Sequence, residues 1–118
     1  FPNTELVKFC QENDILPEAN SPLGSQNQVP TTRETLRENK ELNELAKRSG
    51  YTLAQLLLGW GVRRGYVVLP KSSTPSRIGS NFNVPELSVE EFQAVEEVSK
   101  GWNTRFVDMT HIFGYNVW

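Results

Sequence analysis

Hydrophobic residues recur along the chain with two different spacings, which predict helices and strands in turn. Helical spacing covers approximately residues 4–11, 39–49, 52–64, 75 onward and 88–100. Short apolar runs at 15–19 and 66–69 predict strands, and the second run is β-branched, as is typical of a parallel strand. A helix, a short loop and a strand follow one another from residue 52 to 69, which is half of a βαβ crossover. The pattern predicts an α/β chain with two parallel strands and about five helices.

Start and stop signals support these helices. Thr52 with Gln55 and Ser88 with Glu91 have the spacing of capping boxes, in which each side chain of the pair bonds the other residue's backbone N–H. Glycines that end helices follow three of the predicted segments: Gly50, Gly65 and Gly101. Pro17 is unfavourable inside a central strand because it lacks a backbone donor.

The helical periodicity also predicts which side chains form the core. Leu53–Arg64 is so apolar that we expect most of it to be buried, although Gly59 and Gly61 lower its helix propensity by about 1 kcal/mol each. Cys10 is expected to be a small buried hydrophobic residue. The predicted core residues are Leu6, Val7, Phe9, Cys10, Leu36, Leu42, Leu45, Ala46, Leu53, Leu56, Leu57, Trp60, Val62, Val89, Phe92, Val95, Val98 or Ser99, and Trp102.

Cationic and hydroxyl residues follow the strand at 66–69 directly. Pro70 ends the strand, Thr74 suits a helix N-cap, and Pro75 suits the first helical position. The free N–H groups and dipole of that helix favour an anion, to which Lys71 adds a point charge and Arg77 a planar fork for phosphate oxygens. The stretch predicts a phosphate site at the carboxyl end of a parallel strand, and the alternative is a pair of solvated charges.

Composition narrows the classes of partner. The 118 residues are 37% hydrophobic and 22% charged with a net charge of −2, so we expect a globular chain that binds neither nucleic acid nor an acidic membrane surface. One cysteine permits no intrachain disulfide, which fits a reducing, cytoplasmic location. No apolar run reaches the roughly 20 residues that span a bilayer. The start at Phe1 resembles neither a signal nor a transit peptide, and we expect that the chain has been cut or trimmed.

Two stretches resemble the aldo-keto reductases. Pro70–Asn81, which reads PKSSTPSRIGSN, resembles their third motif, Pro-Lys-Ser-x-Thr-Pro-x-Arg-Ile-x-x-Asn. Asn20–Ser25, which reads NSPLGS, resembles their Tyr-Ser-Pro-Leu-Gly-Ser segment with Asn20 at the tyrosine position. Leu53–Trp60 and the Gly101-Trp102 pair are also similar to that family.

The resemblance covers essentially the whole chain and implies a fold. It implies the carboxyl-terminal part of a (β/α)₈ barrel, from after the sixth strand, with residues 1–118 in one domain and 102–118 as an aromatic tail. A closed barrel needs about 250 residues, and two strands leave hydrogen-bonding edges exposed. We therefore expect the chain, if it stands alone, to self-associate or swap to cover these edges.

The resemblance also implies NADPH as the cofactor. The family's serine-rich segment surrounds the pyrophosphate, its tyrosine stacks on the nicotinamide, its third motif holds the adenosine 2′-phosphate, and the loop at 26–33 can fold over the cofactor. The implied cofactor-binding residues are Asn20, Ser21, Leu23, Ser25, Lys71, Ser72, Ser73, Thr74, Arg77, Ser80 and Asn81.

The implied activity is the reduction of small aldehydes or ketones to alcohols by NADPH. The family's catalytic Asp, Tyr, Lys and His lie on earlier strands and have no counterpart here, so we expect the isolated chain to be inactive. The alternative is a non-catalytic binding or regulatory relative, which Asn20 favours because an amide cannot stack as a tyrosine does.

The carboxyl-terminal tail does not identify the substrate. Its aromatic residues predict either an apolar wall of a substrate pocket or simple surface packing, and they are Phe106, Phe113, Tyr115 and Trp118. His111 has no carboxylate or second ligand at metal spacing, so we expect neither a catalytic nor a metal role for it.

Overall fold

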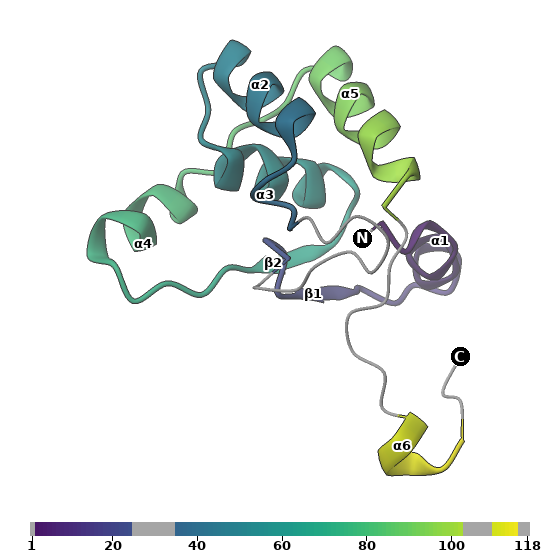
Figure 1. The fold of residues 1–118 in the computed structure, drawn as a ribbon. Helices are drawn as coiled ribbons and strands as arrows, with labels where there is room; N and C mark the ends of the chain where they lie inside the picture. Colours follow the sequence, from purple (N-terminus) through teal and green to yellow (C-terminus); the bar gives the residue numbers. More distant parts are fainter. Residues whose placement is uncertain (1, 25–34, 103–109, 116–118) are drawn as a thin grey trace.

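A computed structural model describes residues 2–24, 35–102 and 110–115 of the chain (Figure 1). These ranges hold two strands and six helices, and the five helices of eight or more residues match the expected number. In chain order the elements are α1 (Thr4–Glu12), β1 (Glu18–Asn20), α2 (Lys40–Arg48), α3 (Leu53–Arg63), β2 (Val67–Leu69), α4 (Pro75–Phe82), α5 (Val89–Lys100) and α6 (Thr110–Phe113). The predicted loop at 26–33 lies outside the described residues.

The two strands pair in parallel, as predicted. Glu18, Ala19 and Asn20 lie opposite Val67, Val68 and Leu69 respectively. β1 begins later than predicted because Pro17 has no N–H, and its carbonyl accepts from the Val67 N–H (3.0 Å) just before the ladder. β2 is half-buried with Leu69 exposed, less covered than expected, since β1 is its only partner strand in the described chain.

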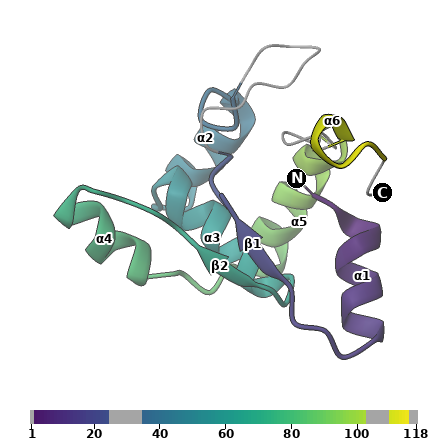
Figure 2. The ribbon, with the colours of Figure 1, turned by 90° about the horizontal axis from the view of Figure 1, so that it is seen from below.

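Three helices, α2, α3 and α5, lie together on one side of the strand pair (Figures 1 and 2). They enclose a continuous apolar core, to which the loop before α2 adds Leu36 and the loop before α5 adds Leu87. The buried residues of this core are Leu36, Leu42, Leu45, Ala46, Leu56, Leu57, Trp60, Leu87 and Val95. This cluster confirms most of the predicted core.

α3 is central because it contacts α2, α4, α5 and β2. Its two glycines permit this close approach: a Cβ at Gly59 would lie 2.8 Å from the Pro85 carbonyl oxygen, and one at Gly61 would lie 2.7 Å from Val68 Cγ1. Both glycines, which lower helix propensity, are therefore required by packing.

Both predicted capping boxes are present. The Thr52 hydroxyl accepts from the Gln55 N–H, and the Ser88 hydroxyl accepts from the Glu91 N–H. The Gln55 and Glu91 side chains accept from the backbone N–H of Thr52 and Ser88 in return. These bonds fix the first turns of α3 and α5.

Some core predictions were wrong. Leu58 is fully buried although it was not predicted, because α3 is covered on several sides, whereas Val62, near its end, is half-exposed. Val89 is exposed because it is the first residue of α5 and points outward. Leu6 and Phe9 are exposed, and α1 buries only Cys10.

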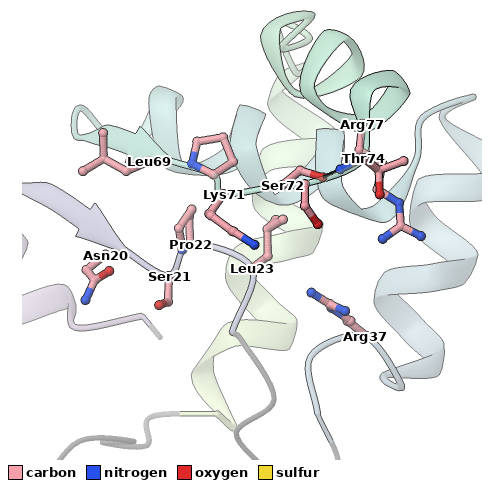
Figure 3. Close-up of a pocket in the computed structure, with 12 residues that line it drawn as sticks. Asn20, Ser21, Pro22, Leu23, Arg37, Leu69, Lys71, Ser72, Thr74 and Arg77 are labelled. Atoms are coloured by element: carbon pink, nitrogen blue, oxygen red, sulfur yellow. Dashed lines mark hydrogen bonds between the residues drawn. The ribbon is translucent and has the colours of Figure 1, made fainter.

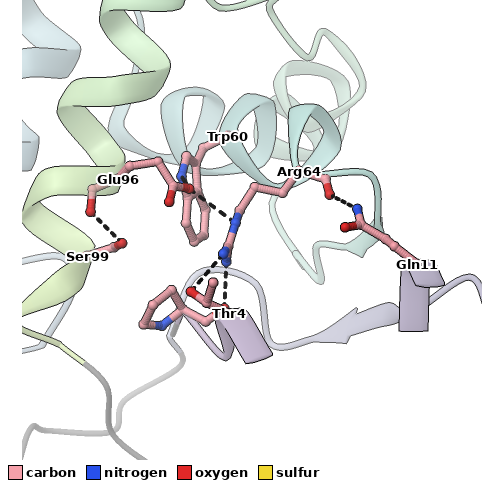
Figure 4. A network of polar contacts seen from close by, with 7 residues as sticks. Thr4, Gln11, Trp60, Arg64, Glu96 and Ser99 are labelled. Carbon is pink, nitrogen blue, oxygen red and sulfur yellow. Dashed lines mark hydrogen bonds and ion pairs between the residues drawn. The ribbon is translucent and has the colours of Figure 1, made fainter. Parts of the chain in front are cut away.

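Arg64 joins α1 to α3 and α5 (Figure 4). Its Nε lies 3.1 Å from Glu96 Oε1, and its terminal nitrogens donate to the Pro2 carbonyl and the Thr4 hydroxyl. The guanidinium also lies over the Trp60 ring, 4.8 Å from its centroid, and the Arg64 carbonyl accepts from Gln11 Nε2. The side chain is only 7% exposed.

The aromatic tail is described in part. Trp102 packs against the core, as expected, whereas Phe113 and Tyr115 are exposed with ring centroids 6.1 Å apart. Residues 103–109 and 116–118 lie outside the described ranges, and with them Phe106 and Trp118. Across the described residues, none of the helices has both the length and the apolar character needed to cross a membrane.

Candidate functional site

A pocket of about 380 Å³ opens at the carboxyl ends of the two strands (Figure 3). The parallel register places Asn20 opposite Leu69, so the loops that follow β1 and β2 leave the sheet side by side. The lining residues are Asn20, Ser21, Pro22, Leu23, Arg37, Leu69, Pro70, Lys71, Ser72, Ser73, Thr74 and Arg77. The loops that carry both sequence motifs therefore form one site.

The loop after β1 is a tight turn. The Gly24 N–H donates to the Ser21 carbonyl (2.9 Å), and both residues have positive φ, 56° at Ser21 and 76° at Gly24. A Cβ at Gly24 would lie 2.8 Å from Leu36 Cδ1, so the turn rests directly on a buried side chain. Ser21 adopts a conformation that is unfavourable without glycine, which is common where a loop is shaped for a ligand.

The loop after β2 leads into α4 and differs in one detail from the prediction. Thr74 occupies the N-cap position and Pro75 the first helical position, as expected, but the Thr74 side chain makes no capping hydrogen bond. Within the loop, the Ser72 hydroxyl accepts from the Thr74 N–H (3.1 Å). The Thr74 hydroxyl can therefore turn toward a ligand without breaking a cap.

The structure gathers eight of the eleven predicted site residues around the pocket: Asn20, Ser21, Leu23, Lys71, Ser72, Ser73, Thr74 and Arg77. Ser80 and Asn81 belong to α4 but do not line the pocket, and the Ser80 hydroxyl donates to the Arg77 carbonyl. Ser25 lies outside the described residues. The cofactor contacts of all eleven stay predictions.

Arg37 is a lining residue that sequence reasoning missed. It lies in the segment before α2, outside both motifs, and no local pattern assigns it to a site. The contact of Leu36 with Gly24 brings this segment beside the turn after β1. Only this long-range packing places Arg37 at the pocket.

The pocket is cationic although the chain as a whole is acidic. The chain has 14 Asp and Glu residues against 12 Lys and Arg, yet the described lining contains Lys71, Arg77 and Arg37 with no carboxylate. Serine and threonine hydroxyls add neutral hydrogen-bonding groups. Such a lining favours an anion with several oxygens, and phosphate is the group that arginine and lysine recognise best in this arrangement.

The ionisable side chains of the described lining are all cationic. Its residues include no His, Cys, Asp, Glu or Tyr, which leaves Lys71, Arg37 and Arg77. In the described part of the chain, His, Cys, Asp and Glu form no cluster of three that could hold a metal ion. The pocket is therefore suited to binding an anionic ligand, and the phosphates of a dinucleotide fit its chemistry.

Known proteins are similar to this chain in sequence and in fold. A sequence profile of the Aldo/keto reductase family matches residues 1–100. The chain is 69% identical over all 118 residues to a glycerol 2-dehydrogenase (NADP(+)) of Hypocrea jecorina, and 42% identical over 110 residues, 92% of the chain, to an aldehyde reductase of Saccharomyces cerevisiae. A crystal structure of an aldose reductase from Giardia lamblia matches 99% of the chain with a TM-score of 0.79 and 31% identity.

The chain spans about a third of the length of these relatives: 37% of the Hypocrea protein, 33% of the yeast protein and 39% of the Giardia chain. Its two parallel strands and their helices are thus part of a (β/α)₈ barrel, the fold expected from the sequence. The profile match over 100 of the 118 residues shows that the chain belongs to the aldo-keto reductase family.

Proposed function

We propose that these 118 residues form the carboxyl-terminal, cofactor-binding part of an NADPH-dependent reductase that converts small aldehydes or ketones to alcohols. The observation that carries the proposal is the cationic pocket at the carboxyl ends of two parallel strands, the end of a barrel at which ligands bind. NADPH carries one phosphate more than NADH, and we expect a lining of three cations without a carboxylate to favour it.

Different parts of the lining suit different parts of the cofactor. Lys71, Ser72, Thr74 and Arg77 are assigned to the adenosine 2′-phosphate, since the loop after β2 and the first turn of α4 combine two cations with two hydroxyls. The turn that begins at Ser21 is assigned to the pyrophosphate. Asn20, at the end of β1, would then lie toward the nicotinamide.

The chain would bind and orient the cofactor rather than supply the proton that reduction requires. Bound NADPH supplies a hydride for the carbonyl carbon. The described lining includes no His, Cys, Asp, Glu or Tyr. As the family resemblance implies, we expect the proton donor to come from other strands of the barrel. The isolated chain is accordingly expected to be inactive.

A small polyol and its ketone are the proposed substrate class. The support is the 69% identity to a glycerol 2-dehydrogenase (NADP(+)) over the whole chain. A second protein with that name, from Saccharomyces cerevisiae, is 40% identical over 100 residues. These matches cover 37% and 30% of the two relatives, so the substrate class of this chain is a proposal.

A non-catalytic binding or regulatory relative is the second candidate, and Asn20 is the observation that favours it. Its amide lies at the pocket where the family motif has a tyrosine. The activity of the unsubstituted full-length protein and of its Asn20→Tyr variant discriminates the candidates. Activity with asparagine in place excludes the second candidate, whereas activity that appears only in Asn20→Tyr supports it.

The first experiment compares NADPH and NADH binding to the full-length reductase by calorimetry. We expect tighter binding of NADPH, and a loss of roughly tenfold or more in NADPH affinity in Arg77→Ala, because a charge-assisted hydrogen bond contributes about 1.5–3 kcal/mol. NADH affinity should barely change. Arg48→Ala, which removes an exposed arginine from the end of α2, is the matched control. Unchanged NADPH affinity in Arg77→Ala would reject the phosphate assignment.

A chimera tests the division of labour. The 118 residues replace the matching segment of the Hypocrea glycerol 2-dehydrogenase, with which they align along their full length. We expect the chimera to oxidise glycerol with NADP⁺ and the isolated 118 residues to have no activity. An active isolated chain would show that the catalytic groups lie within it.

Self-association of the isolated chain is a further expectation. Each strand has one edge without a partner strand in the described residues, and exposed apolar side chains such as Phe82 lie on the surface. Sedimentation equilibrium should give a mass above 13.4 kDa. A stable monomer would contradict the expectation.

A further inference from the structure

Arg37 reaches the pocket from a different part of the chain than the other cations. Lys71 and Arg77 belong to the loop after β2 and to α4, whereas Arg37 precedes α2. Figure 3 shows its guanidinium on the other side of the space below Lys71 and Ser72. The pocket is thus flanked by cations on two sides.

The backbone that carries Arg37 is held firmly. Leu36 is buried in the core, against Gly24. The Arg37 carbonyl accepts from Asn43 Nδ2 (2.8 Å), which ties the residue to α2. The Glu38 N–H donates to the Thr35 carbonyl (3.0 Å) and closes a turn around Arg37. The side chain therefore starts from a fixed point at the rim of the pocket.

The neighbouring carboxylate does not neutralise Arg37. Glu38 Oε2 accepts from both the Thr35 N–H (2.8 Å) and the Thr35 hydroxyl (2.9 Å). Among the described residues, none of the ion pairs includes Arg37, Lys71 or Arg77. Three like charges that face one space repel one another, and an anion placed between them removes that repulsion.

We infer that Arg37 is a third phosphate-binding residue of the cofactor site, acting from the opposite side to Lys71 and Arg77. This inference rests on the proposed function. Its guanidinium would donate to phosphate oxygens of the bound dinucleotide, either those of the pyrophosphate or those of the 2′-phosphate. Two-sided contact would restrain the phosphates more than the loop after β2 alone.

Calorimetric titration of the full-length reductase with NADPH and with NADH tests the inference. Arg37→Ala is expected to lower affinity for NADPH by roughly three- to thirtyfold, and Arg37→Lys to lose less because it keeps the charge without the fork. Arg48→Ala, an equally charge-removing change on α2, should leave both affinities unchanged. The thermal midpoint of ligand-free Arg37→Ala should match that of the unsubstituted protein, because the residue's side chain is exposed.

The two cofactors separate the outcomes. An equal loss for NADPH and NADH places Arg37 at the pyrophosphate, and a loss for NADPH alone places it at the 2′-phosphate; either supports the inference. Unchanged affinity for both cofactors in Arg37→Ala, while Arg77→Ala still weakens NADPH binding, overturns the inference and leaves the proposed function intact. If the unsubstituted reductase binds neither cofactor, both fail.

Discussion

Cationic side chains flank β2 at both ends, and the two ends differ sharply. Arg64, just before the strand, is 7% exposed and is paired with Glu96, two oxygen acceptors of the amino-terminal segment and the Trp60 ring. Lys71 and Arg77, after the strand, are exposed and line a pocket without a carboxylate. The same charge thus joins helices at one end of the strand and remains available to a ligand at the other.

The two ends of β2 show which cations should contribute to folding stability and which to ligand binding. A buried arginine with several partners contributes to folding, because its removal leaves partly buried groups unpaired. Exposed cations that converge without acids contribute little to folding and mainly to the capture of anions. Substitutions at the two ends should therefore affect different measurements.

The largest expected effect is in α3, the helix that leads to the Arg64 end of β2. Gly59→Ala should lower the free energy of unfolding by about 3 kcal/mol, since its Cβ would meet the Pro85 carbonyl at 2.8 Å. Gly79→Ala in α4, where a Cβ meets nothing within 4 Å, should raise it by about 0.5–1 kcal/mol. Urea unfolding of both variants checks this, and equal effects would contradict the packing role of Gly59.

Arg64→Ala is the next largest. We expect a loss of about 2 kcal/mol in the free energy of unfolding, below the usual value for a fully buried pair because Glu96 is 28% exposed and keeps the Trp60 Nε1 donor. Lys100→Ala, which breaks an exposed pair with Glu97, should cost less than about 1 kcal/mol. Cofactor affinity should be unchanged in folded Arg64→Ala protein. A weaker effect than that of Lys100→Ala would contradict the stabilising role of the Arg64 contacts.

The smallest effect concerns the turn beside Arg37. Hydrogen bonds from the Thr35 N–H and hydroxyl lower the pKa of the Glu38 carboxyl below its ordinary value of 4.5. A lowered pKa in the folded state means that ionised Glu38 adds stability above pH 4.5, and that this is lost as pH falls through the folded value. Glu38→Gln should therefore be slightly less stable than the unsubstituted protein at pH 7, with the gap closing in acid. Thermal midpoints between pH 7 and 3 measure it, and a gap independent of pH would contradict the assignment.

Local sequence signals predicted the fold well where local chemistry decides it. The capping residues Thr52 and Ser88 and the strand at 67–69 are examples. Side-chain burial was harder to predict. Leu58 is buried and Val62 is exposed because different neighbours cover them, and their local sequence pattern does not show this. Only the tertiary packing reveals why Gly59 must be glycine.

The candidate site divides in the same way. The two motif loops were predictable, since each follows a strand and parallel strands end at one edge. Arg37 was not, because it is placed at the pocket by the contact of Leu36 with Gly24, a tertiary contact between residues 12 positions apart that no local pattern predicts. The hydrogen bond from the Thr74 N–H to the Ser72 hydroxyl depends on loop geometry that the motif does not specify.

The most direct test of the central claim follows the phosphorus atoms themselves. Phosphorus NMR of NADPH added to the full-length protein resolves the 2′-phosphate from the pyrophosphate. We predict that binding shifts the 2′-phosphate signal and lowers that group's pKa below about 6, because Lys71 and Arg77 favour its dianion. The shift should shrink in Arg77→Ala and persist in Arg64→Ala. A 2′-phosphate signal that stays at its free position and titrates normally, while NADPH is bound, would contradict the account.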